Sequence, residues 1–272
     1  MSGLGKQVRL NRILGHPSGR MFSVAVDHFV GYAATMQDGL VDLPTTIGKM
    51  LGAGPDAVTM LAGTARSCWP AHAGRTALII QAGCFTPDDR VSELLSTPEE
   101  ALSLGADAIA VAIGVRGPSE GRYLRMLADT VRAADRLELP VFAHIYPRHY
   151  VDGQATIVTD PEEIAWAARC GIECGADVVK IAYSGDKDSF AEIVSNCPRP
   201  VVAAGGARTL TLDSALRTAQ SALAAGARGV TVGRNIWGAP DVEAAARAFA
   251  LVIHDGKTPG LALDAMAVPA RQ

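Results

Sequence analysis

The sequence lacks the features that would place it in a membrane, outside the cell or on a nucleic acid. Although 49% of its 272 residues are hydrophobic, no apolar run reaches the roughly 18 residues that a membrane span needs. The first residues, MSGLGKQVRLNRI, hold neither an apolar core nor a cleavage site, so secretion is not expected. The formal net charge of -3 gives no basic excess for a nucleic acid. We expect a cytoplasmic protein with no membrane partner and no nucleic-acid partner.

Cysteine is scarce and its spacing is irregular. The five cysteines are Cys68, Cys84, Cys170, Cys174 and Cys197. Cys170 and Cys174 lie four residues apart in a helical stretch and could suggest a metal pair, but no second pair and no nearby histidine accompanies them. The six histidines show no zinc-ligand spacing either. We therefore expect reduced, packed thiols, no metal and no cofactor.

No Pro- or Ser-rich linker, charge block or low-complexity stretch divides the chain, so we expect a single domain over residues 1–272. A recurring phrase organises it instead: GAGPDAVTML, GADAIAVAI, GADVVKIAY and GARGVTVG begin at Gly52, Gly105, Gly175 and Gly226. Each phrase places a glycine where a helix ends, before an apolar run that is too short and too β-branched to be a helix. Thr97-Pro98 and Asp160-Pro161 have the pattern of helix starts.

These runs predict eight strands separated mostly by helices. The expected strands are Phe22–Asp27, Ala57–Leu61, Ala77–Gly83, Ala108–Ile113, Pro140–Tyr146, Asp177–Tyr183, Pro200–Gly205 and Gly229–Gly233. Continuous apolar strands that alternate with helices are typical of a parallel sheet covered on both faces. Eight units in roughly 250 residues match a closed (β/α)8 barrel, the TIM barrel. The alternative is an open doubly wound sheet, but VAVDHFVGYA, from Val24, is not a dinucleotide fingerprint.

The active site of such a barrel lies at the C-terminal ends of the strands, and one expected strand carries a lysine there. In VVKIAY, Lys180 shares its face with Val178 and Ala182, which we expect to point inward. A buried ammonium is costly, and burial favours the neutral amine, which is a usable nucleophile. Alternatively, Lys180 extends to solvent or pairs with Asp186.

The preceding strand places further polar residues on the inward face. In VFAHIYPRHY, Phe142, His144 and Tyr146 share one face. Tyr146 ends beside Lys180 and could relay protons, or could be a half-buried aromatic with its hydroxyl in water. His144 lies one layer deeper, where a satisfied core residue is more common than a catalyst. Asp27, at the end of the first strand, is either an acid/base group or a cap.

The last two strands predict a phosphate site. AAGGAR and VGRN each end a strand in glycine just before a helix. Barrels of this kind often bind phosphate on backbone N–H groups after strands seven and eight. Gly205, Gly206 and Gly233 would let the backbone approach closely, and Arg208 and Arg234 would supply charge.

The sequence resembles the archaeal-type class I fructose-bisphosphate aldolases, within the DeoC/LacD-like aldolases. This family also includes 2-amino-3,7-dideoxy-D-threo-hept-6-ulosonate synthase and the autoinducer-2 thiolase. The likeness covers nearly the whole chain, from VAVDH at Val24 to IHDG at Ile253. It also includes YPR at Tyr146, GADVVKIAYSGD at Gly175, CPRPVVAAGG at Cys197 and GARGVTVGRNIW at Gly226.

The resemblance implies a role for each matching residue. Lys180 would form the Schiff base, Tyr146 would donate or accept protons, and Asp27 would be a second acid/base group. Further residues would contact the substrate: Gly205, Gly206, Arg208, Gly233 and Arg234 at its phosphate, Arg148 near its other end, and His28 and His144. The resemblance also implies a metal-free enzyme and a homo-oligomer, since many members of the family assemble as rings of ten subunits.

Three departures concern the substrate. Phe29–Tyr32 replace the family's usual segment after VAVDH, Gly205 to Arg208 read GGAR where the family has Gly-Gly-Pro-Lys, and His144 stands where the fructose-bisphosphate aldolases have Trp. The sequence predicts a class I aldolase that acts through Lys180 on a phosphorylated ketose or related keto compound. The alternatives are a transaldolase-type or thiolase-type transferase on the same scaffold, and a phosphate-binding barrel that forms no imine, such as an isomerase or a binding protein.

Overall fold

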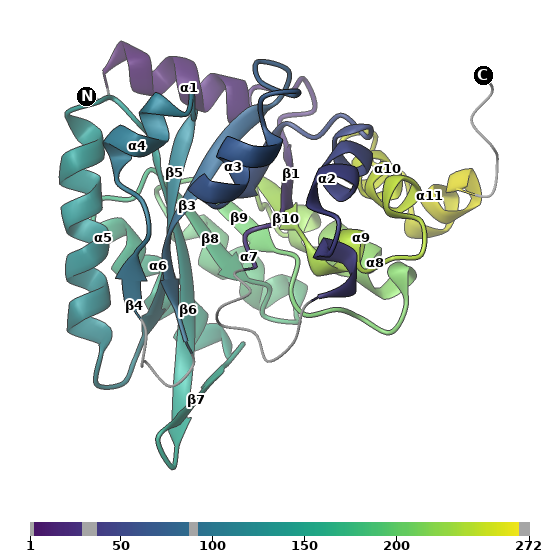
Figure 1. The fold of residues 1–272 in the computed structure, drawn as a ribbon. Coiled ribbons are helices and arrows are strands. Elements are labelled where there is room, and N and C mark those ends of the chain that lie inside the picture. Colours follow the sequence, from purple (N-terminus) through teal and green to yellow (C-terminus); the bar gives the residue numbers. More distant parts are fainter. Residues whose placement is uncertain (1–2, 29–36, 87–91, 267–272) are drawn as a thin grey trace.

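The computed structural model describes residues 3–28, 37–86 and 92–266, which form a closed parallel barrel surrounded by helices (Figure 1). The ring consists of β1 (Met21–Ala25), β2 (Ala57–Met60), β3 (Ala77–Phe85), β5 (Ala108–Val115), β6 (Val141–Val151), β8 (Val178–Ala182), β9 (Val201–Ala204) and β10 (Gly229–Val232). The pairing of β2 with both β1 and β3 closes it. The predicted (β/α)8 barrel is confirmed.

Helices cover the outside of the ring and one of its ends. They are α1 (Leu4–Leu14), α2 (Leu43–Leu51), α3 (Ala62–Cys68), α4 (Pro98–Ser103), α5 (Glu120–Asp135), α6 (Pro161–Glu173), α7 (Lys187–Ser195), α8 (Leu212–Ala224), α9 (Arg234–Trp237), α10 (Val242–Ile253) and α11 (Pro259–Met266), with the 3-10 turn η2 (Asp38–Leu40). The predicted starts of α4 and α6 are confirmed, since Thr97 and Asp160 accept hydrogen bonds from Glu100 N and Glu162 N. None of the helices in the described ranges is long and apolar enough to cross a membrane.

The interior of the barrel changes character along its axis. At the N-terminal ends of the strands the inward side chains are apolar, with Phe142, Val178 and Val202 among them. Helix α1 covers this end, where Ile13 is fully buried against the same cluster. Because strand residues alternate between two faces, the next inward residues towards the C-terminal ends are His144 and Lys180. The polar residues therefore begin above an apolar floor.

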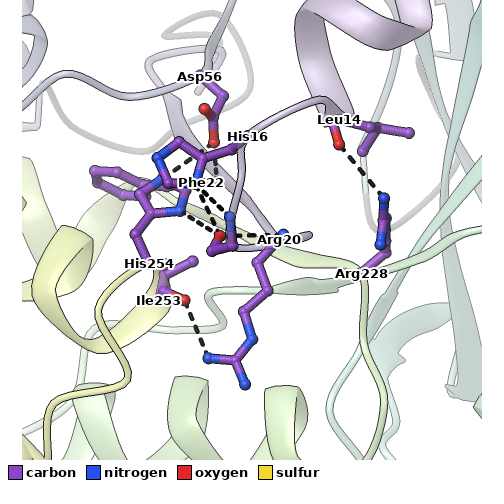
Figure 2. A network of polar contacts seen from close by, with 9 residues as sticks. Leu14, His16, Arg20, Phe22, Asp56, Arg228, Ile253 and His254 are labelled. Atoms are coloured by element: carbon purple, nitrogen blue, oxygen red, sulfur yellow. Dashed lines mark hydrogen bonds and ion pairs between the residues drawn. The ribbon is translucent and has the colours of Figure 1, made fainter.

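A network of polar contacts connects distant segments of the chain at the α1 end of the barrel (Figure 2). The ring of His254, at the end of α10, stacks on His16 with 3.6 Å between centroids. Ser18 Oγ lies 2.8 Å from Nδ1 of His16 and 3.0 Å from Nδ1 of His254. Asp56 accepts a hydrogen bond from Phe22 N and lies 3.2 Å from His254 Nε2. These contacts join the segments before β1 and β2 to the end of α10.

Two antiparallel additions lie at the opposite end, and the sequence analysis missed both. Strand β6 was expected to end at Tyr146, but it continues to Val151 and pairs with β7 (Gln154–Ile157) in a hairpin that extends from the end of the barrel opposite α1 (Figure 1). Asp152 and Gly153 form its turn with φ of 50° and 76°, the conformation that an Asp-Gly pair favours. Strand β4 (Ser92–Leu94) pairs with the end of β3.

Candidate active site

A cavity of about 650 Å³ opens at the C-terminal ends of the strands. Its walls include nine of the eleven residues predicted to form the site: Asp27, His28, His144, Tyr146, Lys180, Gly205, Gly206, Gly233 and Arg234. They come from β1, β6, β8, β9 and β10 or from the segments that follow these strands. Strand alternation therefore brings residues more than 200 positions apart in the chain to one place.

Lys180 lies inside the cavity with 6% of its surface exposed. In the parallel register it stands between His144 on β6 and Val202 on β9. Asp186, the alternative partner, instead accepts a hydrogen bond from Ser189 N and caps α7. Within the described residues no carboxylate forms an ion pair with Lys180. The structure thus places this amine where a ligand in the cavity would meet it.

His144 is a buried, neutral imidazole next to Lys180. Burial, and then the charge of Lys180, hold the pKa of His144 well below 6.5. A neutral imidazole has one donor and one acceptor nitrogen. Although only 2% of its surface is exposed, His144 lines the cavity, so it is more than a buried core residue.

His28 and Asp27 follow β1 at the rim. The two side chains lie 3.7 Å apart between His28 Nδ1 and Asp27 Oδ1. Burial lowers the pKa of His28; Asp27 opposes this shift, and Arg234 and Lys180 reinforce it. The His28 ring packs edge-on against Trp237, with 5.2 Å between centroids. Gly233 permits this packing, because a side chain there would come 2.8 Å from His28 Cε1.

The two glycine loops meet through Asn235, whose role the sequence analysis missed. Its Nδ2 donates to the carbonyl oxygens of Gly205 (2.9 Å) and Ala207 (3.0 Å). Its Oδ1 accepts from the N–H and the hydroxyl of Thr209. The buried amide therefore fixes the loop after β9 to α9. Gly205 N donates to Thr231 O at 2.7 Å, so this N–H is already paired within the protein.

Two predicted substrate contacts do not line the cavity. Arg148 is 3% exposed and lies over the rings of Tyr123 and Tyr150, 5.0 and 5.1 Å from their centroids. Gly114 makes room for it, because a side chain there would come 2.1 Å from Arg148 Nε. Arg208 is exposed and lines a neighbouring hollow with Arg234. The predicted contacts of Arg148 and Arg208 with the substrate therefore stay predictions, since neither side chain lies in the cavity wall.

Gln81 on β3 is a cavity residue that the sequence analysis missed. Its Nε2 donates to Gly83 O at 2.6 Å. Its Oε1 is buried and accepts no hydrogen bond from the described residues. No sequence signal marked it, because one glutamine in an apolar strand fits no motif.

The cysteines remain protonated thiols near neutral pH. Cys84 lines the cavity, and burial followed by the charge of Asp27 raises its pKa to about 12. Burial likewise raises the pKa of Cys170 to about 11. Among the described residues no group of three or more His, Cys, Asp or Glu side chains could hold a metal ion.

The comparison with known protein families identifies the kind of barrel. Residues 21–239 match the model of the DeoC/LacD family aldolases. The chain belongs to this family. The match extends from the first residue of β1 to just after α9 and so includes every residue of the cavity wall.

Individual relatives agree with this assignment. A 2-amino-3,7-dideoxy-D-threo-hept-6-ulosonate synthase of Halobacterium salinarum is 35% identical over 266 residues, 97% of each chain. A 2-amino-4,5-dihydroxy-6-oxo-7-(phosphonooxy)heptanoate synthase of Streptomyces griseus is 32% identical, over 94% of this chain and 93% of its own. The crystal structure of an archaeal fructose 1,6-bisphosphate aldolase superposes with a TM-score of 0.80 at 32% identity, over 92% of this chain and 100% of that one.

Proposed function

We propose that this aldolase cleaves or forms a C–C bond in a phosphorylated keto compound through an imine on Lys180. The observation that carries the proposal is the position of Lys180, buried on the inward face of β8 and in the cavity wall. The family and the solved structures similar to this chain support it, since one of those structures, 32% identical, is described as a Schiff base forming fructose-1,6-bisphosphate aldolase.

The residues of the cavity can supply each step of an imine mechanism. The Lys180 amine adds to the carbonyl carbon, and loss of water gives an iminium that takes up the electron pair of the neighbouring C–C bond. An aldehyde leaves and an enamine remains; protonation on carbon and hydrolysis of the imine release the second product. Tyr146 and Asp27 are the proposed proton carriers for these steps.

The phosphate of the substrate would occupy the β9 and β10 side of the cavity. Gly206 has a φ of +69°, and Arg234 has a buried Nε without a hydrogen-bond partner among the described residues. A guanidinium in this state is a ready donor to a phosphate oxygen. Asn235 supports the site by holding the two loops together.

The substrate class has two candidates among the relatives. The two synthases match nearly the whole chain, which favours C–C bond formation. The fructose-bisphosphate aldolase of Thermoproteus tenax is 39% identical but over 58% of this chain. His144, which stands where the fructose-bisphosphate aldolases have Trp, also favours a substrate other than fructose 1,6-bisphosphate.

Borohydride trapping tests the imine directly. The protein would be reduced with sodium borohydride in the presence of dihydroxyacetone phosphate, fructose 1,6-bisphosphate and simple keto acids, and its intact mass measured. We expect one adduct, on the peptide that carries Lys180, and none in Lys180→Met. Lys187→Arg, at the exposed start of α7, is the matched control and should still be labelled. Labelling of another lysine, or no adduct with any compound, would overturn the proposal.

We keep two further expectations as proposals: a cytoplasmic location, which was inferred from the sequence, and a homo-oligomer, which the family resemblance implies. Sedimentation velocity of the purified chain measures the assembly without reference to activity. A monomer at micromolar concentration would contradict the predicted oligomer.

A further inference from the structure

The amide of Gln81 is held by a hydrogen bond to the backbone of its own strand, and its side-chain oxygen is an unpaired acceptor. Its side chain lines the cavity and exposes 2% of its surface. The amide nitrogen donates to Gly83 O at 2.6 Å, and a carbonyl oxygen can only accept, so this bond fixes which end of the amide is which. The Oε1 atom is left buried, with no donor among the described residues.

A β-bulge explains why the amide is held in this position. In the register between β3 and β5, Gln81 pairs with Ala110 while Gly83 pairs with Val111, so β3 contains one extra residue there. Bulges release a backbone group from the ladder and redirect a side chain, often beside an active site. Here Gln81 Nε2 satisfies the Gly83 carbonyl at the bulge, so the backbone of β3 itself positions the amide.

The closed strand order places Gln81 across the barrel from the proposed phosphate loops. The ring runs β2, β1, β10, β9, β8, β6, β5, β3 and back to β2, so β3 stands opposite β9 and β5 opposite β10. Lys180 on β8 lies beside the phosphate side. A substrate held by its phosphate after β9 and β10 and by its carbonyl carbon at Lys180 therefore extends its other half towards β5 and β3.

The part of the cavity wall that would face this other half carries one small side chain between two polar ones. The cavity wall there includes Ala112 on β5, between Gln81 on β3 and His144 on β6. Alanine leaves space for a ligand, and the glutamine supplies an unused acceptor. Leaving a buried acceptor unpaired costs free energy that a bound donor recovers.

We propose that Gln81 is a specificity-determining residue whose Oε1 accepts a hydrogen bond from a hydroxyl group on the aldehyde half of the substrate. This inference rests on the proposed imine chemistry at Lys180 and assigns the acceptor side of the same cavity. It predicts that the enzyme distinguishes a hydroxylated aldehyde from one of equal size that carries methyl groups.

The test compares two aldehydes in C–C bond formation. Dihydroxyacetone phosphate is the donor, and glyceraldehyde and 2-methylbutanal, which has methyl groups in place of both hydroxyls, are the acceptors. The enamine carbon bonds to the aldehyde carbon, the aldehyde oxygen takes a proton, and water then hydrolyses the imine. For the wild type we expect kcat/KM to be about tenfold or more higher with glyceraldehyde. In Gln81→Met this ratio should fall towards one, mainly through the KM for glyceraldehyde.

Two controls separate the role of Gln81 from a general defect. Gln37→Met changes another glutamine of the cavity wall, which also lines the neighbouring hollow with Arg234, and should leave the ratio of the two aldehydes unchanged. Borohydride trapping of dihydroxyacetone phosphate at Lys180 should be equal in the wild type and in Gln81→Met, because the proposed arrangement places the donor half away from residue 81.

The possible outcomes are distinguishable. Equal use of both aldehydes by the wild type, or an unchanged ratio in Gln81→Met, would overturn the role of Gln81 and leave the imine proposal standing. No adduct of dihydroxyacetone phosphate or of any other keto compound at Lys180 would overturn both. A ratio that falls equally in Gln37→Met and Gln81→Met would assign the preference to the shape of the cavity and not to the Gln81 acceptor.

Discussion

Individual residues of the site owe their chemistry to what surrounds them. Lys180 and His144 are adjacent in the β6–β8 register, and burial lowers the pKa of His144, so the imidazole beside the amine adds no second charge. Tyr146 lies one inward step further towards the rim on the same strand. This order, from floor to rim, places the phenol of Tyr146, the proposed proton carrier, above the amine.

Tyr146→Phe should separate imine formation from turnover. The substitution removes the phenol and keeps the ring, so we expect a folded protein that still gives the borohydride adduct. Turnover should fall on the order of 10²- to 10⁴-fold, the usual contribution of a general acid or base. Steady-state kinetics and intact-mass measurement on the same preparation check this. Near-normal turnover would assign proton transfer to Asp27 or His144.

At the scale of elements, the sequence predicts the strands that repeat one pattern and misses what departs from it. All eight barrel strands were predicted because each is a short apolar run between helix signals. The β6–β7 hairpin was missed although Asp152-Gly153 is a turn signal, because the run to Tyr146 already filled one barrel strand. Ile157 of β7 lines the cavity, so the omission also hid part of the site.

Among the site residues, too, the sequence predicts those that follow strand alternation and misses those that depend on packing. Inward alternation was enough to place Lys180, Tyr146 and His144 in one cavity. It could not show that Gly114 gives Arg148 a place over two tyrosine rings, because that depends on packing between strands and helices. The roles of Gln81 and Asn235 depend on a bulge and on a contact between two loops, neither of which leaves a periodic pattern.

Helix α1 depends on one buried lysine, which makes its contribution to stability sensitive to high pH. Lys6 Nζ lies 2.5 Å from Asp135 and 2.9 Å from Asp177. Burial alone would lower the pKa of Lys6, but its hydrogen bonds and charge interactions with the two carboxylates raise it above 10.5. Because the pKa of Lys6 is higher in the folded than in the unfolded chain, its ammonium stabilises the fold fully below pH 10.5. This stabilisation is lost as the pH rises through the pKa of Lys6 in the folded state.

Lys6→Met should therefore destabilise the protein at neutral pH and less at high pH. Removing one partner leaves Asp177 buried without its counter-charge, at a cost of about 3 kcal/mol. Urea unfolding at pH 8 and at steps up to pH 12 measures the difference in unfolding free energy between wild type and variant. The difference should narrow above pH 10.5. A difference that is constant with pH would show that the methylene stem of Lys6, and not its charge, stabilises α1.

At the scale of the whole molecule, the barrel separates stability from chemistry along its axis. The cavity lies at the C-terminal ends of the strands, whereas the apolar floor, α1 and the His16–Ser18–His254 contacts lie at the N-terminal ends (Figure 2). In barrels of this kind, residues at the N-terminal face serve stability and those at the C-terminal face serve catalysis. Variants at the two ends should therefore give opposite phenotypes.

His254→Leu tests this separation. The variant keeps a side chain of similar bulk but loses the stacking on His16 and the contacts with Ser18 and Asp56. We expect a loss of about 1–3 kcal/mol, since Asp56 and Ser18 lose a polar neighbour in a site where His254 is 8% exposed. For a chain of this length that lowers Tm by roughly 2–4 °C per kcal/mol. The kcat/KM at 25 °C should stay within about twofold of the wild type, whereas Tyr146→Phe should keep the wild-type Tm and lose activity. If His254→Leu lost activity at an unchanged Tm, the two ends would be coupled, and the network in Figure 2 would have to act on the geometry of β1 and so on Asp27 at its far end.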